Sequence, residues 1–421
     1  MHRFIIIFFF GLPAFADDPF ERPPINYSKS KPDNIIERLK LRLESNEVEW
    51  TKEKNTGYLR GLLKALDISI ESQTLVYSKT SFQAKLIEPA RPRALYFNDD
   101  IYVGYVPKSN LLELSVADPK LGAVFYTFDQ DNISLERETS DCLSCHGTSR
   151  TGHTPGHLLR SVTTKPNGHI IFRAGTELVN HTTEYGHRWG GWYADGTRLP
   201  AQNHANLHGK ITSEDDLSFV KYNEKEQLSN FFDSELYLSN HSDVVALMVQ
   251  DHQVEMHNLF AKANHRTRVA IHYQKIMDEA LNRDSTCLSE STSSIIANMG
   301  DKLLSYLLFT NEIPLPNPIK GSTNFEKIFS QRKPRDNMNR SLYELDLETR
   351  LLKYPCSYLI YSDTFEQLPV QMKDYLYKKL WDILNDTDPS YPIKVKNSKD
   401  RKNIKEILLS TKSDLPKYWK I

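Results

Sequence analysis

Long apolar stretches are rare in this chain of 421 residues. After residue 12 the most apolar run is Leu303–Phe309, far shorter than the roughly 20 residues that a membrane-spanning helix needs. Cysteine is rare as well: the chain has four, too few to build a fold of this length on disulfides. The sequence therefore predicts neither a membrane span nor a disulfide scaffold.

Neither sign of charge dominates. The chain has 53 Lys and Arg against 54 Asp and Glu, which leaves a net charge of −1. Nucleic acid and anionic membranes attract proteins through an excess of positive charge. We therefore expect neither as a partner. Internal repeats and low-complexity segments are also missing.

The first 16 residues have the order of features typical of a secretory signal peptide. Arg3 supplies the positive charge, Phe4–Leu12 is apolar, and Ala14-Phe15-Ala16 matches a cleavage site, so the mature chain would begin near Asp17. No cysteine follows this site to carry a lipid anchor. We therefore expect an exported, periplasmic protein.

Histidine is concentrated in the middle of the chain, and the cluster begins at two cysteines. Of the 14 histidines, all but His2 lie between His146 and His272. Cys142 and Cys145 are three residues apart, and His146 follows directly, so one helical turn places all three side chains on one face. This C-x-x-C-H string is the attachment motif of haem c. It predicts two thioether bonds, from Cys142 and Cys145, and His146 as the proximal iron ligand.

Two other uses of the motif are open at this stage. A zinc site would need further ligands, and the sequence has no second C-x-x-C, so they would come from distant histidines. A redox dithiol would need a βαβ context, which the surrounding pattern does not indicate. Export favours haem c, which is attached outside the cytoplasm.

The motif resembles that of c-type cytochromes. A wider resemblance rests on "PRALYFNDDIYVGYV" (92–106), "CLSCHGTSR" (142–150), "RWGGWYADG" (188–196) and "TRLLKYPCSYLIYS" (349–362). Together these segments are similar to a large family of exported bacterial proteins with a single C-x-x-C-H. The resemblance implies an exported monohaem protein.

The remaining patterns predict an α+β fold. Short β-branched and aromatic segments separated by turn signals predict a small antiparallel N-terminal sheet with helices, followed by a loop-rich haem region and a helical C-terminal half. The predicted parts are 1–16 (signal peptide), 17–140 (α+β unit), 141–240 (haem and loops) and 241–421 (helical). The predicted helices are 35–44, 58–66, 242–282, 294–309, 341–353, 369–386 and 400–410; the predicted strands are 74–78, 94–97, 101–106, 111–116 and 122–128; and 165–175 is predicted as a turn followed by a strand.

The second axial ligand decides between an electron carrier and an open reaction site. In the helix predicted over 242–282, capped by Ser242, His252 lies on an apolar stripe with Met248 and Met256. These three are candidates, and the loop residues His181 and His204 are two more. A core histidine bonded to backbone, with methionines as core filler, is the plain alternative. His257, His265 and His272 are expected on a solvated face of the same helix.

Other residues of the central region are open to two interpretations. Trp189, Trp192 and Tyr193 would wall a haem edge or pack under a loop. One or more arginines would pair with haem propionates or be solvated: Arg150, Arg160, Arg173 and Arg188. Cys287 and Cys356 would form a disulfide or stay free, with Cys356 buried.

Three functions follow from this sequence. The first is electron transfer to or from a partner protein through one covalent haem c. The second is a haem-dependent oxidoreductase that acts on a small substrate or a peroxide at an open distal site. The third is a haem-containing binding or sensing module. The chain is several times longer than one small carrier domain, so it has surface to bind a substrate or a docking protein.

Overall fold

The computed structural model describes residues 18–45, 47–48, 50–211, 217–221, 228–284 and 286–420. The predicted signal peptide lies outside this range. The fold is α+β, as the sequence predicts, with an N-terminal antiparallel sheet and a helical C-terminal half. The helices are α1 (Ile35–Glu44), α2 (Leu59–Ala65), α3 (Leu143–His146), α4 (Val244–Ala280), α5 (Glu290–Leu307), α6 (Phe325–Ser330), α7 (Asp363–Glu366), α8 (Val370–Asn385) and α9 (Ser398–Thr411).

One large sheet organises the N-terminal half. Its strand order is β6-β5-β4-β3-β2-β1-β9, and every neighbouring pair is antiparallel. Two small hairpins, β7–β8 and β10–β11, lie outside it. The strands are β1 (Thr74–Val76), β2 (Arg93–Phe97), β3 (Ile101–Tyr105), β4 (Leu111–Asp118), β5 (Gly122–Asp129), β6 (Ser134–Glu138), β7 (Arg160–Val162), β8 (Thr176–Leu178), β9 (Trp192–Tyr193), β10 (Leu207–Ile211) and β11 (Leu217–Lys221).

The two faces of the sheet pack against different partners because side chains alternate along a strand. Leu112, Leu114 and Val116 of β4 join one core cluster with apolar residues of α1 and α2. Tyr102 of β3 points the other way and joins a second cluster with α4 and the C-terminal helices. The sheet is therefore covered by helices on both sides.

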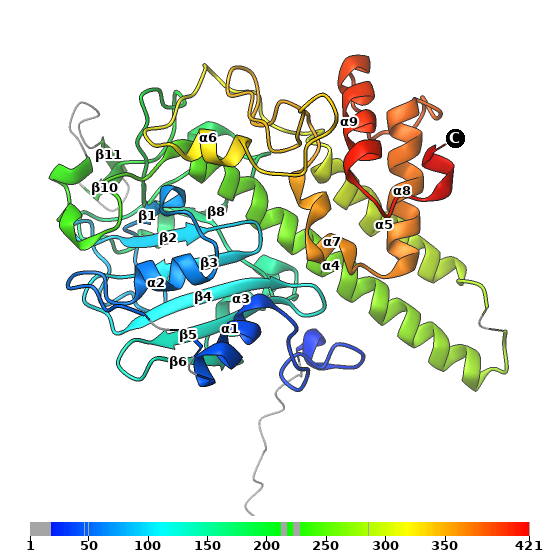
Figure 1. Cartoon of the computed structure of the whole chain (residues 1–421), viewed down its shortest axis with the longest axis horizontal. Helices are drawn as coiled ribbons and strands as arrows, with labels where there is room; N and C mark the ends of the chain where they lie inside the picture. The colour runs from blue at the N-terminus through cyan, green and yellow to red at the C-terminus, as the bar shows by residue number, and fades with distance from the viewer. Residues whose placement is uncertain are drawn as a thin grey trace, which may run out of the picture.

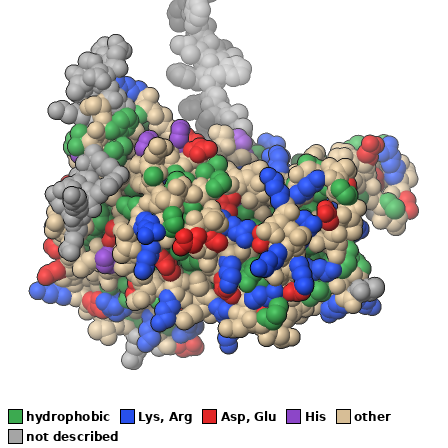
Figure 2. Space-filling view, turned by 90° about the horizontal axis from the view of Figure 1, so that it is seen from above, with side chains coloured by type: hydrophobic (Ala, Val, Ile, Leu, Met, Phe, Trp, Pro, Cys, Tyr) green, Lys and Arg blue, Asp and Glu red, His purple; other side chains and the backbone are tan. Residues whose placement is uncertain are grey.

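The long helix α4 connects the two halves of the molecule. It contacts β1 and β5 at the sheet and α5, α6, α7 and α8 beyond it, and Figure 1 shows it running from the sheet to the C-terminal helices. Positive and negative side chains are interspersed on the face seen in Figure 2. None of the helices in the described residues is both long enough and apolar enough to cross a bilayer.

Most predicted elements are confirmed, and two predicted elements are wrong. The segment 341–353 forms no helix, because the Asp346 carboxylate accepts hydrogen bonds from the backbone of Glu348, Thr349 and Arg350 and closes a turn instead. In 165–175 a 3-10 turn (Phe172–Ala174) replaces the expected strand. Strand β6 was not predicted.

Asp243, not Ser242, caps α4. Its carboxylate accepts from the backbone N–H groups of Val245 and Ala246. It also accepts from the backbone N–H of Ser322 and from both the N–H and the hydroxyl of Thr323. The side chain is fully buried, so one carboxylate both starts the helix and holds the 321–323 loop against it.

We predict that Asp243→Ala lowers the free energy of unfolding by about 3 kcal/mol, because it removes a helix cap and leaves buried loop donors without an acceptor. Ser289→Ala is the matched control, since Ser289 caps α5 through a single backbone N–H, that of Thr292; its cost is expected to be about 1 kcal/mol. Urea denaturation measures both. An equal decrease in the free energy of unfolding for the two variants would contradict the double role of Asp243.

Candidate functional site

The C-x-x-C-H segment forms a single helical turn shortly after β6, an edge strand of the large sheet. The N–H groups of Cys145 and His146 both donate to the carbonyl of Cys142, at 3.2 and 3.0 Å. Leu143 is buried and anchors the turn, whereas Cys145 is exposed and Cys142 is partly buried. The turn therefore presents two free thiols and one imidazole from five consecutive residues.

His146 is held by a backbone carbonyl. Its ring Nδ1 lies 2.8 Å from the carbonyl oxygen of Gly156, and a carbonyl can only accept, so Nδ1 carries the proton. Phe125 of β5 packs against the ring, with the ring centroids 4.7 Å apart. Burial lowers the pKa of His146, which favours the neutral ring. In this tautomer Nε2 carries the free lone pair of the ring.

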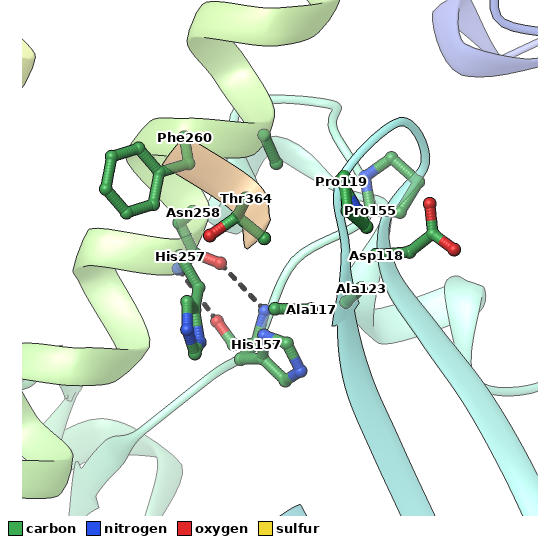
Figure 3. Close-up of a pocket in the computed structure, with 12 residues that line it drawn as sticks. Ala117, Asp118, Pro119, Ala123, Pro155, His157, His257, Asn258, Phe260 and Thr364 are labelled. Atoms are coloured by element: carbon green, nitrogen blue, oxygen red, sulfur yellow. Dashed lines mark hydrogen bonds between the residues drawn. The ribbon is translucent and has the colours of Figure 1, made fainter. Parts of the chain in front are cut away.

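Asn258 of α4 fixes the loop that supplies this carbonyl. Its Oδ1 accepts from the backbone N–H of His157 at 2.8 Å, and its Nδ2 donates to the His157 carbonyl at 2.9 Å, as the dashed lines in Figure 3 show. Gly156 is required here, because a Cβ at that position would come within 2.6 Å of the Asn258 Oδ1. The helix thus positions the loop, and the loop positions His146.

Two further histidines lie close to this turn. His157 and His257 line the same recess between α4 and the β4–β5 hairpin, shown in Figure 3, and their ring centroids are 5.8 Å apart. The hydroxyl of Tyr102 lies 3.1 Å from Nδ1 of His257, and its ring packs against His157 at a tilt, with the ring centroids 4.7 Å apart. Burial lowers the pKa of both histidines, to about 3 for His257. Sequence patterning placed His257 on a solvated face and did not single out His157.

The prediction that His257 and His265 lie on a solvated face is wrong. His257 is 3% exposed and His265 is 5% exposed, because α4 is enclosed by the sheet on one side and the C-terminal helices on the other. His265 lies 3.1 Å from the carbonyl of Lys120 through Nε2. His272, further along, is only partly buried. On this helix a polar side chain such as His265 therefore indicates packing against a loop carbonyl and not exposure to solvent.

The predicted distal candidates His181 and His252 lie together, in the core cluster of α4 and the C-terminal helices. Their Nδ1 atoms are 2.9 Å apart, and Nε2 of His252 lies 2.7 Å from the hydroxyl of Ser357. Tyr306 stacks on His181 with a centroid distance of 3.9 Å. Both ring nitrogens of His252 are thus engaged within the protein.

The other predicted ligands lie in different surroundings. Met248 and Met256 are buried in the same core cluster as α4 and the C-terminal helices. His204 lies in a loop, where its ring faces His187 at 6.4 Å and Phe219 at 6.0 Å. Cys142, in contrast, packs at the edge of the cluster that contains the apolar residues of α1 and α2.

The tryptophans and Arg188 pack inside the protein. Trp189 is fully buried, and its Nε1 donates to Asp251, which also forms a buried ion pair with Arg188. Trp192 donates to the carbonyl of Arg160. Tyr193 is buried too and donates to the Pro89 carbonyl. Of the four predicted arginines, Arg150 and Arg173 are exposed and Arg160 is half-buried.

All four cysteines lie in the described residues, and none is paired. Cys287 is exposed and Cys356 is fully buried, in agreement with the free-thiol alternative. Burial raises the pKa of Cys142 to about 12, and the carboxylates of Glu113 and Glu138 add to the effect. Within the described residues, no group of three or more His, Cys, Asp or Glu side chains is arranged to hold a metal ion.

Comparison with known proteins gives no match: no family model, no curated protein and no solved structure matches this chain.

The buried histidines predict an acid-sensitive fold, and His265 gives the clearest test. Burial, with the Arg268 guanidinium, lowers its pKa to about 4 from the usual 6.5. The unfolded chain then takes a proton that the folded chain refuses, so stability is lost as pH falls below about 6.5. We expect His265→Gln, which can still donate to Lys120, to reduce the loss of unfolding free energy between pH 7 and pH 5 by about 2 kcal/mol.

The comparison of variant with wild type is needed because three buried carboxyls act in the opposite direction. Burial raises the pKa values of Asp100, Asp251 and Glu312 to about 7, so their contributions are lost as pH rises. The contributions of these carboxyls are the same in the variant and the wild type, so they cancel in the difference between the two free energies of unfolding. Urea unfolding at several pH values measures it, and parallel pH profiles for His265→Gln and wild type would contradict the prediction.

Proposed function

We propose that this protein is an exported monohaem c-type cytochrome-like protein that transfers electrons through one covalently bound haem. Cys142 and Cys145 would form the two thioether bonds, and His146 would be the proximal iron ligand. When bound, haem c supplies one-electron chemistry at its iron.

The observation that carries the proposal is the hydrogen bond from Nδ1 of His146 to the Gly156 carbonyl. A histidine that ligates a metal through one nitrogen usually donates its other N–H to a carbonyl or carboxylate, which fixes the ring and its tautomer. The chain supplies this arrangement without any cofactor present. The two free thiols on the same turn are the other groups that haem c needs.

The surroundings of His146 also fit an iron ligand. Burial against Phe125 favours the neutral ring, which is the form that binds a metal. The carbonyl acceptor makes the imidazole a stronger electron donor. The clamp by Asn258 keeps the acceptor in place. These residues orient the ring and hold its proton on Nδ1.

One observation favours the alternative of an oxidoreductase with an open distal site. His181 and His252 bond to each other, and Met248 and Met256 are packed in the core cluster of α4 and the C-terminal helices. An iron whose sixth position has no strong protein ligand can bind a small substrate or a peroxide. The alternative keeps the same three residues for attachment and differs only at the distal face.

We expect the full chain, produced in a host with a cytochrome assembly system, to have a mass increased by that of one haem. Acid and organic solvent should not extract this haem. Cys142→Ala and Cys145→Ala should each leave a single thioether, which shifts the pyridine haemochrome band. Mass spectrometry and that spectrum measure both results. Cys287→Ala is the matched control, since Cys287 is an exposed cysteine outside the motif. A colourless wild-type protein would refute the proposal.

The distal ligand is tested by His252→Ala. Because both ring nitrogens of His252 are hydrogen-bonded within the protein, we expect the ferric absorption spectrum and the spin state to stay those of the wild type. Met248→Leu and Met256→Leu serve as companions. A change from low spin to high spin in one variant alone would instead assign that residue to the iron.

A further inference from the structure

The free end of the α4–α5 hairpin concentrates exposed apolar side chains. Six of the 16 large apolar side chains that are exposed in the described part of the chain lie within residues 273–295, which we call the hairpin tip, and each is 37–53% exposed. They are Tyr273, Ile276, Met277, Leu281, Leu288 and Ile295. Figure 1 shows the last turns of α4 and the start of α5 extending past α8. A partner can therefore reach the hairpin tip.

The apolar residues of α4 in the hairpin tip have the spacing of a buried helix face. They stand at positions i, i+3, i+4, i+7 and i+8: Tyr273, Ile276, Met277, Ala280 and Leu281. A surface helix places an apolar stripe with this spacing against a core, yet all five residues are exposed. Contiguous apolar surface of this kind marks an interaction site, whereas scattered single side chains do not. The described part of the chain leaves this stripe uncovered.

The returning chain covers a different side of α4. Gln274 donates through Nε2 to the carbonyl of Cys287 at 2.8 Å, and its Oε1 accepts from the backbone N–H of Ser289 at 3.0 Å. The same Nε2 donates to the carboxylate of Asp278, which is buried. These bonds hold the start of α5 on the Gln274 side and keep the hairpin tip ordered. The apolar stripe is thus presented by a regular helix.

Charge is distributed unequally along the hairpin. Residues 262–268, before the hairpin tip, include three basic side chains and no acidic one: Lys262, Arg266 and Arg268. The hairpin tip has two basic side chains against four acidic ones, a net charge of −2: Lys275 and Arg283 against Asp278, Glu279, Asp284 and Glu290. Arg266 is exposed and lies seven residues before Tyr273, on the face of the stripe. A basic end and an acidic end therefore border one apolar stripe.

This pattern is complementary to itself. In a two-fold symmetric interface the same surface meets its copy, so that residue i contacts j and j contacts i. Two α4 helices packed antiparallel about the level of Lys275 bring Arg266 of each copy to the level of Asp284 of the other. The same arrangement sets Tyr273 against Met277, and thioether–aromatic contacts are favourable. A parallel pair would instead bring like charges together.

An anionic lipid surface fits the hairpin tip less well. Amphipathic helices that lie on such membranes carry lysine and arginine on their polar face, because these residues are attracted to the lipid headgroups. The hairpin tip has a net charge of −2, from four acidic and two basic side chains. The charges therefore favour a second copy of this chain over a membrane.

We propose that this protein forms a homodimer in which the two α4–α5 hairpins pack antiparallel through the stripe of Tyr273, Ile276, Met277, Ala280 and Leu281. The interface contains no residue of the C-x-x-C-H turn, so the proposal is independent of the proposed function. A hairpin-sized contact is at the lower end of interface areas, which predicts a Kd of about 1–100 μM.

Sedimentation equilibrium of the purified full chain, over about 1–200 μM, measures this Kd. Met277→Glu places a charge at the centre of the stripe and should raise the Kd at least about tenfold. Phe82→Glu is the matched control, since Phe82 is an exposed apolar side chain outside the hairpin, and it should leave the Kd unchanged. Circular dichroism checks that both variants are folded.

A charge exchange tests the antiparallel arrangement. Arg266→Glu and Asp284→Arg should each raise the Kd about fivefold at low ionic strength, because each sets like charges against each other in both halves of the dimer. The chain with both substitutions restores opposite charges and should recover most of the affinity. An unfolding effect of either substitution would add up in the double variant and could not produce this recovery.

Four outcomes would overturn the proposal. They are a wild-type chain that stays monomeric over the whole range, a dimer that Met277→Glu leaves intact, a double charge exchange that restores no affinity, and a monomer that sediments with phosphatidylglycerol vesicles unless Met277 is replaced by Glu. The last result would assign the stripe to a lipid surface. A colourless chain that still dimerises would refute the proposed function and leave this inference standing.

Discussion

The amide of Asn258 is the contact on which the rest of the site depends. It binds both backbone groups of His157 and so ties the loop after α3 to the longest helix of the molecule. Through that loop the position of one carbonyl, that of Gly156, is set, and with it the tautomer and the direction of the His146 ring. The amide can come this close only because residue 156 is a glycine and has no Cβ. One side chain of α4 thus fixes the position of the motif beside the sheet relative to the helical half.

The same helix accounts for part of the concentration of histidine, since it carries His252, His257, His265 and His272. Along α4 the buried polar residues are Gln250, Asp251, His252, Gln253, His257, Asn258, Asn264, His265, Thr267 and Asp278. Several of them meet carbonyls or side chains from distant segments: Gln253 donates to Asn98, Asn264 to Pro119, and Asp251 accepts from Trp189. Loops lack the regular backbone hydrogen bonds of helices and strands. A helix buried under loops therefore needs polar side chains that bond to the backbone N–H and C=O groups of those loops. His252, His257 and His265 meet this need inside the protein, and burial lowers their pKa values, which favours the neutral rings.

The sequence predicted the sheet well, because alternation and turn signals are local properties. It also predicted α1, α4, α5, α8 and α9, because their apolar residues recur with the period of a helix. It failed at 341–353, where the Asp346 side chain competes with the helix for backbone N–H groups, an effect that periodicity does not record. The C-x-x-C-H motif could be read directly. The roles of His157 and Asn258 could not, because Asn258 bonds to a residue 101 positions away and the loop geometry places His157 beside His146.

The raised pKa of Cys142 has a consequence for the reactivity of the two free thiols on this turn. Thiol–disulfide exchange proceeds through the thiolate, and a thiol whose pKa is about 12 has almost none at neutral pH. Cys145, exposed on the same turn, is the sulfur that an oxidant or a mixed-disulfide partner would reach first. Burial and the carboxylates around Cys142 thus disfavour its thiolate, which slows closure of a Cys142–Cys145 disulfide and leaves both sulfurs as free thiols.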